Sequence, residues 1–298
     1  MAKSQKQSVL ITGCSEGGIG FALAQEFHRR GLRVFATARN LGKVQHLRDA
    51  GLEVIQLDVV DPASIRSAVE NVSQLTGGAL DILVNNAGNG YQIPILDADL
   101  AEARRLFEVN LFGVLAMTQA FAPLLVAAAT KGSKPRIVNI GSVVSRVPVP
   151  WGGVYNASKG ALAILNDTMR LELRPLGIEV LHVVTGGIAT KFYTNSGGQK
   201  LPEGSLYSPI ASHIEANVGG GEAKAKQTVT AETYARKVVG NALSSRPTTT
   251  MWIGGMSFIS WFGIKFGWDS VRDLIITRMF SMASLEKKLK ESRQLPKA

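Results

Sequence analysis

The sequence predicts an α/β protein, a single domain over residues 1–298 in which about seven parallel strands form a doubly wound sheet with helices on both faces. Three observations support this fold class. Short apolar runs recur along the chain, longer segments of helical period separate them, and a glycine-rich turn follows the first run. Runs that are apolar throughout, rather than at alternate positions, are typical of strands buried on both faces of a parallel sheet.

The expected strands are the Val-, Ile- and Leu-rich runs at residues 8–12, 33–37, 53–57, 79–84, 136–140, 179–184 and 250–253. Two long helices are expected in the middle of the chain. The first covers 99–129, and Pro123 is the point at which it could break. The second covers 154–173 and would end at Pro175 and Gly177.

Two further segments complete the expected domain, whose core covers about residues 8–255. Residues 190–226 are rich in glycine and proline without a sustained period, and so long a loop in a compact domain is usually a lid, here over a substrate. Residues 256–298 form an apolar helical extension. The uncharged apolar stretch that leads into it, 251–264, is shorter than the roughly 20 residues that span a bilayer. Three interpretations remain: a wall of an apolar substrate pocket, a membrane-surface anchor helped by basic residues, or a core and oligomer contact.

Composition excludes several classes of protein. The chain has 33 basic and 23 acidic residues, a net charge of +10, which favours phosphate-bearing ligands or an anionic membrane surface. The basic residues are dispersed and not interleaved with aromatics, so nucleic acid is not expected. The single cysteine, Cys14, rules out a disulfide within the chain, and the scattered histidines predict no metal site. A polar start without a secretory signal predicts a cytoplasmic protein.

The motif Thr-Gly-Cys-Ser-Glu-Gly-Gly-Ile-Gly occupies residues 12–20, between the first expected strand and a helical pattern. Glycines permit positive φ and let backbone N–H groups approach a pyrophosphate at a helix N-terminus, where the helix dipole favours negative charge. The order of strand, glycine turn and helix predicts a Rossmann-type dinucleotide site. A tight strand-to-helix connection without a ligand would show the same order.

The second strand ends at Ala38-Arg39-Asn40, about where NAD-specific sites carry an acidic residue for the ribose hydroxyls. No carboxylate stands here. Ala38 leaves a 2′-phosphate without repulsion, and Arg39 offers it a planar set of donors. The sequence therefore predicts NADP(H) as the cofactor rather than NAD(H), with a solvated loop arginine as the alternative.

Tyr155 and Lys159 are four residues apart in an expected helix, so their side chains lie on one face. A free tyrosine has a pKa of about 10. A tyrosine that exchanges its proton near pH 7 needs this pKa lowered by about 3, which corresponds to roughly 4 kcal/mol. One positive charge about 4 Å away, at an effective dielectric constant of 20, supplies energy of about that size. Ser142 follows the strand 136–140, where its hydroxyl could bind a substrate oxygen.

These motifs occur together and in order: the glycine turn, Asn85-Asn86-Ala87-Gly88, Asn110 within FEVNLFG, Ser142 and YNASK. In this combination the chain closely resembles the short-chain dehydrogenase/reductase family over about residues 8–255. The sequence GCSEGGIG, the strand ending in Arg39 and the apolar extension look most like its NADPH-dependent 1-acyldihydroxyacetone-phosphate reductase-like branch. That branch also holds reductases of secondary metabolites.

The resemblance implies a role for each matching residue. Tyr155 would be the general acid in reduction and the base in oxidation, Lys159 would tune Tyr155 and bind the nicotinamide ribose, Ser142 would orient the carbonyl, and Asn110 would hold a water for proton relay. The implied cofactor-binding positions are Gly13, Ser15, Gly18, Ile19, Gly20, Arg39, Asp58, Asn86, Ala87, Gly88, Tyr155, Lys159, Ile188 and Thr190. Asn86 and Gly88 could instead only form a turn, and Asp58 could only cap a loop.

Two departures from the family pattern affect these assignments. Four residues, Cys14 to Gly17, separate Gly13 from Gly18 where the family has three, so the loop must bulge. In Thr185-Gly186-Gly187-Ile188-Ala189-Thr190 the proline that commonly precedes the first glycine is missing.

The resemblance implies an NADPH-dependent reductase of a ketone, or dehydrogenase of the matching alcohol, on a hydrophobic substrate such as an acyl-dihydroxyacetone phosphate. A tailoring reductase or dehydrogenase of a polycyclic or polyketide-like secondary metabolite or steroid is the rival enzyme class, and a cofactor-binding scaffold without activity is the rival outside enzymology. We expect a homodimer or homotetramer in the cytoplasm. Peripheral contact with the endoplasmic reticulum or lipid droplets through the C-terminal segment is left open.

Overall fold

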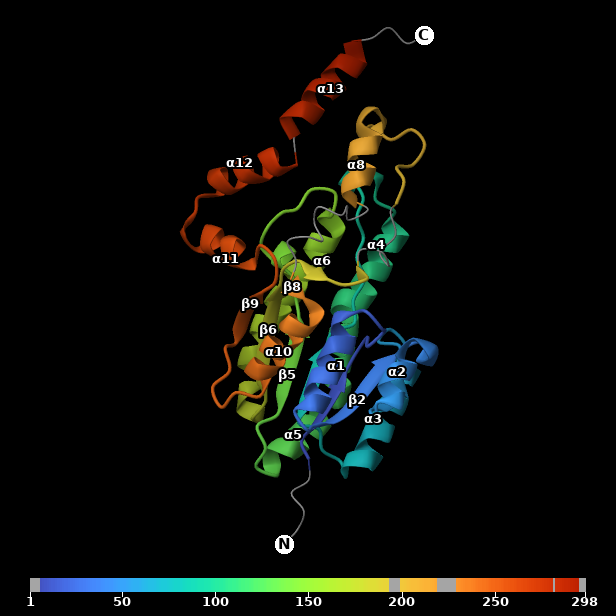
Figure 1. Cartoon of the computed structure of the whole chain (residues 1–298), viewed down its shortest axis with the longest axis vertical. Helices are drawn as coiled ribbons and strands as arrows, with labels where there is room; N and C mark the ends of the chain where they lie inside the picture. Colours follow the sequence, from blue (N-terminus) through green and yellow to red (C-terminus); the bar gives the residue numbers. More distant parts are fainter. Residues whose placement is uncertain (1–5, 193–198, 219–228, 281, 295–298) are drawn as a thin grey trace.

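The computed structural model describes residues 6–192, 199–218, 229–280 and 282–294 (Figure 1). It confirms the expected fold class. Seven strands form one sheet in the order β3-β2-β1-β4-β5-β6-β9, and every neighbouring pair is parallel. The strands are β1 (Ser8–Ile11), β2 (Arg33–Ala38), β3 (Glu53–Gln56), β4 (Ile82–Asn85), β5 (Arg136–Ile140), β6 (Glu179–Thr185) and β9 (Thr250–Ile253). Two short strands, β7 (Ile188–Ala189) and β8 (Val229–Thr230), pair separately.

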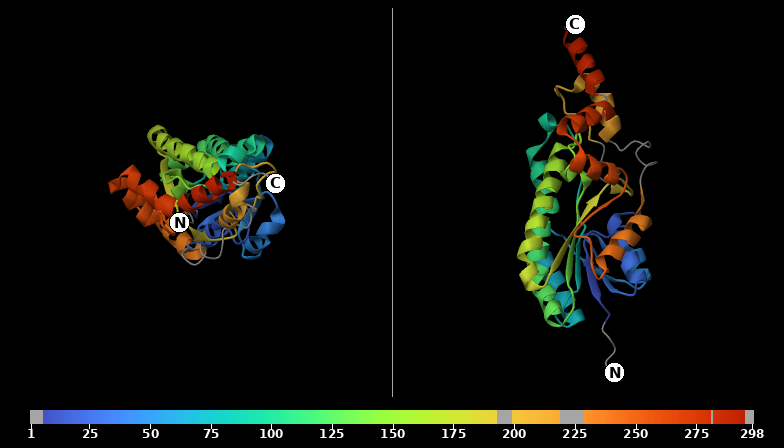
Figure 2. Two further views of the ribbon diagram at one scale, coloured as in Figure 1. Left: turned by 90° about the horizontal axis from the view of Figure 1, so that it is seen from above. Right: turned by 90° about the vertical axis from the view of Figure 1, so that its left-hand side faces the viewer.

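Helices cover both faces of the sheet (Figure 2). The helices on one face include α1 (Ile19–Arg29) and α10 (Ala231–Ala242), and those on the other include α3 (Pro62–Thr76), α5 (Gly113–Thr130) and α6 (Gly153–Glu172). The remaining α-helices are α2 (Gln45–Asp49), α4 (Leu100–Phe107), α8 (Ala211–Val218), α11 (Ser257–Phe266), α12 (Asp269–Met279) and α13 (Met282–Gln294). The last three form the expected helical extension.

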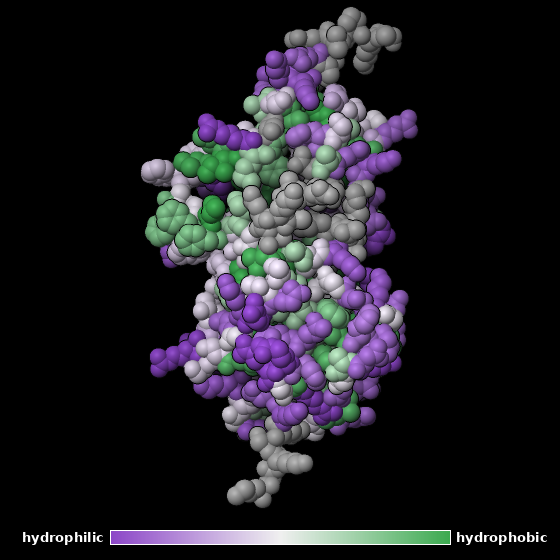
Figure 3. Space-filling view, viewed as in Figure 1, coloured by the Kyte–Doolittle hydropathy of each residue, from purple (hydrophilic) through white to green (hydrophobic). Residues whose placement is uncertain are grey.

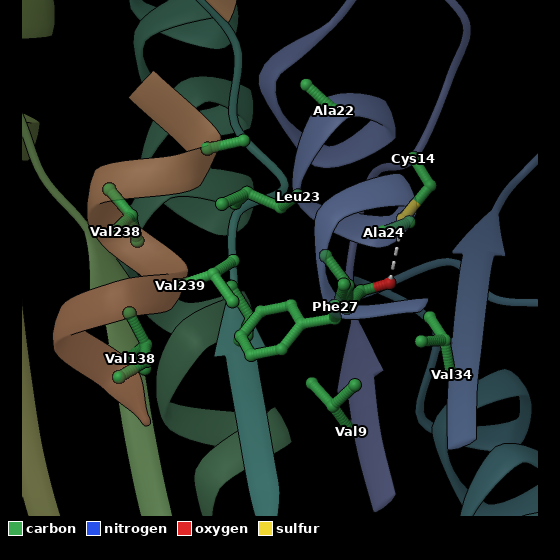
Figure 4. Packing of buried hydrophobic residues seen from close by; sticks show 14 of the residues in the cluster. Val9, Cys14, Ala22, Leu23, Ala24, Phe27, Val34, Val138, Val238 and Val239 are labelled. Atoms are coloured by element: carbon green, nitrogen blue, oxygen red, sulfur yellow. Dashed lines mark hydrogen bonds between the residues drawn. The ribbon is translucent and has the colours of Figure 1, made fainter. Parts of the chain in front are cut away.

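Two apolar layers, one on each face of the sheet, make up the core. Side chains alternate along a strand, so Val9 belongs to the layer under α1 and α10 while its neighbour Leu10 belongs to the opposite layer. Figure 4 shows the first layer, in which Phe27 of α1 lies between Val9 and Val239 of α10. Strands buried on both faces explain why the runs are apolar throughout.

The long middle helix differs from expectation. Pro123 lies inside α5, which continues past it without a break. The irregularity comes earlier, where a π-helical turn, η3 (Glu108–Phe112), joins α4 to α5 and contains Asn110. By length and composition, residues 100–130 could cross a membrane. In the structure, however, α5 packs against β4 and α3 with Met117 and Phe121 buried in the core.

The expected lid over residues 190–226 lies partly outside the described residues. Its described part is not wholly irregular, because it contains a 3₁₀ turn, η6 (Ser208–Ile210), and α8. Ile210 and Ile214 from these elements pack with Leu285 of α13, and Trp151 contacts the same cluster. This part of the chain therefore connects the C-terminal extension to the loop that precedes α6.

Candidate active site

The glycine turn packs directly against the end of β4. Gly13 has φ +71°, and a Cβ there would lie 3.0 Å from the Cα of Ala87. A Cβ on Gly20 would lie 2.5 Å from both Asn86 Nδ2 and the carbonyl oxygen of Gly13. Glycine is thus required at both positions by close approach, and at Gly13 also by backbone conformation.

The extra residue in the turn is accommodated before α1 begins. Gly17 adopts φ +77°, and the N–H of Gly18 donates to Ser15 O over 3.1 Å. Gly18 then serves as the N-cap of α1, and Ile19 is the first helical residue. The expected bulge is therefore a turn over residues 15–18. The N–H groups of the first turn of α1 lack intrahelical acceptors and can bind a phosphate there.

Asn86 and Ala87 are tied to the same turn by hydrogen bonds. Their backbone N–H groups both donate to Thr12 Oγ1 over 2.9 Å. The side-chain amide of Asn86 donates to the carbonyl oxygens of Thr12 at 2.7 Å and Gly13 at 3.0 Å. These bonds hold the predicted cofactor positions on β1, α1 and β4 in one rigid unit.

Arg39 and Asp58 lie just beyond the ends of β2 and β3, at the carboxyl edge of the sheet. Arg39 is exposed, and its carbonyl oxygen accepts a hydrogen bond from Gln56 Nε2 over 3.1 Å. Asp58 is half-buried, its N–H donates to Ser64 Oγ, and its carboxylate accepts from the N–H of Val60. The Asp58 carboxylate thus closes a local turn, while the Arg39 guanidinium is accessible to a ligand.

Lys159 and Asn110 meet beside Gly88. A Cβ on Gly88 would lie 3.2 Å from Asn110 Oδ1 and 3.6 Å from Lys159 Nζ. The amide of Asn110 is fixed, since Oδ1 accepts from the N–H of Asn89 and Nδ2 donates to Asn89 O and to Ser158 Oγ. Lys159 Nζ donates to Ile140 O over 3.1 Å. The ends of β4 and β5, the π turn and α6 therefore converge at this point.

Ser142 and Tyr155 belong to the same region. Ser142 is buried two residues after Ile140, and its hydroxyl accepts from the N–H of Val144. Tyr155 lies in the first turn of α6 and packs against a small cluster that includes Tyr91 and Ile93. Its ring centroid is 6.0 Å from that of Phe192, so this residue, three positions after β7, lies beside the tyrosine ring.

Burial determines the charge state of Lys159. Desolvation lowers the pKa of its ammonium group from 10.5 to about 8, because the surroundings replace little of the lost hydration. Near pH 7 the group is still mostly protonated. It can therefore supply the positive charge that a tyrosine needs in order to ionise near neutral pH.

Ile188 and Thr190 occupy the short segment after β6. Ile188 is buried in β7, and Thr190 Oγ1 accepts a weak hydrogen bond from the N–H of Phe192. Thr185 stands where the family commonly has a proline before the first glycine. Thr185 Oγ1 lies 2.8 Å from the hydroxyl of the fully buried Tyr234 in α10, so a side-chain hydrogen bond anchors this segment.

Sequence reasoning missed a row of buried polar groups beneath the site. Asn85 Nδ2 donates to Asn139 Oδ1, and Asn139 Nδ2 donates to Asn166 Oδ1, each over 2.9 Å. His182 is buried beside Gly141, and burial lowers the pKa of its imidazole to about 4. The signal for such a row is an asparagine at the same register of paired strands, as with Asn85 opposite Asn139.

A cavity of about 570 Å³ adjoins α6. The loop after Ser142 lines it with Val144, Val149 and Trp151, while Asn156 of α6 and Arg272 of α12 close other sides. This volume is within the range of small-molecule sites.

Trp151 has φ +64°, a strained conformation for a bulky residue, and its ring packs edge-on against Tyr207 at 5.5 Å.

A doubly wound sheet with a glycine turn before α1, and a helix that carries Tyr-x-x-x-Lys with the lysine buried, defines a nicotinamide-dependent oxidoreductase acting on alcohols and carbonyls. Residues 7–200 match the family model described as short chain dehydrogenase. The chain belongs to this short-chain dehydrogenase/reductase family, whose members bind NAD(P).

Two similar sequences and one similar solved structure illustrate the position of the chain within this family. It is 44% identical over 276 residues to the short-chain dehydrogenase ptmH of Penicillium ochrochloron, covering 92% of this chain and 98% of that one. It is 42% identical over 213 residues to the NADPH-dependent 1-acyldihydroxyacetone phosphate reductase of Schizosaccharomyces pombe, covering 70% of each chain. A crystal structure of a short-chain dehydrogenase from Streptomyces avermitilis superposes with a TM-score of 0.75 at 27% identity, covering 94% of this chain and 99% of that one.

Proposed function

We propose that the protein is an NADPH-dependent reductase of a ketone on a hydrophobic substrate, able to oxidise the matching alcohol in reverse. The observation that carries the proposal is the convergence of Lys159, Asn110 and the first turns of α6 beside Gly88, at the sheet edge that holds the glycine turn. Gly88 leaves space against the ammonium and amide groups, and α1 presents backbone donors, so the residues present fit a dinucleotide.

NADPH supplies the hydride when bound, and the chain supplies the proton. Tyr155 donates its phenolic proton to the carbonyl oxygen, and the Lys159 ammonium stabilises the phenolate that remains. The Ser142 hydroxyl orients the carbonyl oxygen. Asn110, fixed by Asn89 and Ser158, holds the water through which Lys159 exchanges protons with solvent.

The proposed preference for NADPH depends on Arg39, whose exposed guanidinium follows β2 where a carboxylate would repel a 2′-phosphate. Direct titration of the wild type should show tighter binding of NADPH than of NADH. Arg39→Asp should reverse or abolish the difference, while Arg66→Asp, an equal charge change at an exposed position of α3, should leave it intact. Preference of the wild type for NADH would contradict the assignment.

The cavity beside α6 has an apolar wall that includes Val144, Val149 and Trp151, and this wall favours a hydrophobic substrate. Polar side chains, among them Arg146 and Arg272, line the rest of the cavity. One class of substrate, an acyl-dihydroxyacetone phosphate, is supported by the relative from Schizosaccharomyces pombe. The other class, a polyketide-like or polycyclic ketone such as a steroid, is the alternative that the family resemblance leaves open. NADPH consumption with a panel of both classes separates them. Cofactor binding without turnover of any carbonyl would favour the scaffold alternative.

Assembly and location are further parts of the proposal. We propose a homodimer or homotetramer in the cytoplasm, with the C-terminal segment as its contact with the endoplasmic reticulum or lipid droplets. Sedimentation velocity measures the assembly, and fractionation of cells that express the chain measures the location.

A further inference from the structure

Helices α11 and α12 expose large apolar side chains. Trp268 is 78% exposed and Phe258 71%. Figure 3 shows hydrophobic residues gathered at the left edge of the molecule, over α11 and α12, whereas the lower body is mostly hydrophilic. We define the arm surface as Phe258, Ile259, Phe262, Phe266, Trp268 and Leu274. A concentration of this kind marks an interaction site.

We propose that the arm surface docks on an anionic lipid surface. The first argument is its shape. At 100° per residue, Phe258, Phe262 and Phe266 share one side of α11, while the exposed Ile264 points about 120° away from Phe258 and about 160° away from Phe266. A helix that is apolar on several sides is covered well only by a medium that surrounds it. Lipid can do so, whereas one face of a rigid second copy covers a single side.

Charge supports the same occupant. Lys265 of α11 and Arg278 of α12 are exposed and make no ion pair with any residue that the structure describes. In contrast, Arg272 is paired with Asp269 and Asp273. Unpaired cations beside apolar side chains are the arrangement that binds anionic headgroups, at about fivefold in affinity for each cation near the surface.

The aromatic side chains suit the boundary between headgroups and acyl chains. The rings of Phe262 and Phe266 are 5.1 Å apart, and those of Trp261 and Phe266 are 6.1 Å apart. Trp268 stands between α11 and α12. Tryptophan favours this boundary because its ring is apolar and its N–H is polar.

Docking would place the cavity beside α6 near the lipid. Arg272 of α12 lines that cavity together with Asn156, the residue after Tyr155. A hydrophobic ketone could then move from the bilayer to the active site with little exposure to water. Docking deepens the proposed contact of the C-terminal segment with lipid, whereas this consequence rests also on the proposed reaction.

The test is co-sedimentation of the full chain with vesicles of phosphatidylcholine alone or with phosphatidylserine added. We expect tighter binding to the phosphatidylserine vesicles. The double variant Phe262→Glu/Trp268→Glu should bind the vesicles at least about tenfold more weakly than the wild type. Leu75→Glu, at an exposed apolar position of α3, is the matched control and should bind like the wild type. Circular dichroism and reduction of a water-soluble ketone check that each variant is folded.

Failure of the wild type to bind either vesicle, or equal losses in the double variant and in Leu75→Glu, would overturn the proposal. So would a double variant that binds vesicles normally but forms a smaller oligomer, because the arm surface would then be a subunit interface. Vesicle binding requires no turnover, so its outcome is independent of whether the proposed reaction is correct.

Discussion

At the scale of single residues, Lys159 is the group on which the proposed chemistry depends most. Its four-residue spacing from Tyr155 is visible in the sequence. The lowering of the tyrosine pKa that one nearby positive charge can produce can be estimated from that spacing. The sequence does not show that Lys159 is fully buried or that its ammonium donates to Ile140 O. Those features arise where α6 packs back against the end of β5, and the spacing of residues does not reveal this packing.

The lowered pKa of Lys159 predicts a pH dependence of stability. The folded pKa of about 8 is below the unfolded value of 10.5, so its contribution is complete above 10.5 and is lost as pH falls through 8. From pH 7 to 9 the wild type should therefore gain about 1 kcal/mol from this group relative to Lys159→Met. Urea unfolding of both proteins at the two pH values measures the difference. A difference that does not change with pH would contradict the assigned pKa.

His182 predicts an effect on the acidic side. Burial holds its folded pKa at about 4, below the ordinary 6.5, so its contribution is complete above 6.5 and is lost as pH falls toward 4. The wild type should lose about 2 kcal/mol more than His182→Gln between pH 7 and 5. Denaturant titrations at these pH values test this, and parallel losses in the two proteins would show that His182 does not titrate as a buried group.

At the scale of elements, the glycine turn and α1 depend on close approach to β4. A methyl group at Gly20 would lie 2.5 Å from Asn86 Nδ2, so Gly20→Ala should destabilise the fold by about 1–3 kcal/mol and weaken cofactor binding. Gly240→Ala is the matched control, because its Cβ would meet open space within α10. It should stabilise the fold by about 0.5–1 kcal/mol. Equal effects of the two variants in thermal unfolding would rule out the close contact.

The elements also show where sequence patterns stop being informative. The seven strands were predictable because each is an apolar run. β4 nevertheless starts at Ile82 rather than at residue 79, and the Asp81 carboxylate just before it accepts a hydrogen bond from the N–H of Ser8. Pro123 was a weak guide because a helix can continue past a single missing donor. The π turn at Asn110 carries no composition signal, and it is fixed by contacts to Asn89 and Ser158.

At the scale of the whole molecule, the fold and most of the candidate site follow from motifs that stand at strand ends. Parallel strands bring these ends to one edge, so Gly88 and Lys159 meet although they are far apart in sequence. The cavity could not be foreseen in the same way. It depends on how Trp151, Asn156 and Arg272 come together from a loop, a helix and the C-terminal extension, and no local pattern encodes that packing.

The central claim is that Tyr155 delivers the proton while a bound nicotinamide delivers the hydride. The most direct measurement follows NADPH absorbance during turnover of a hydrophobic ketone by the wild type and Tyr155→Phe, with cofactor affinity determined separately. The account predicts that Tyr155→Phe still binds NADPH but turns over at least about a hundredfold more slowly, the usual scale of lost general acid catalysis. Unchanged turnover in Tyr155→Phe would contradict it.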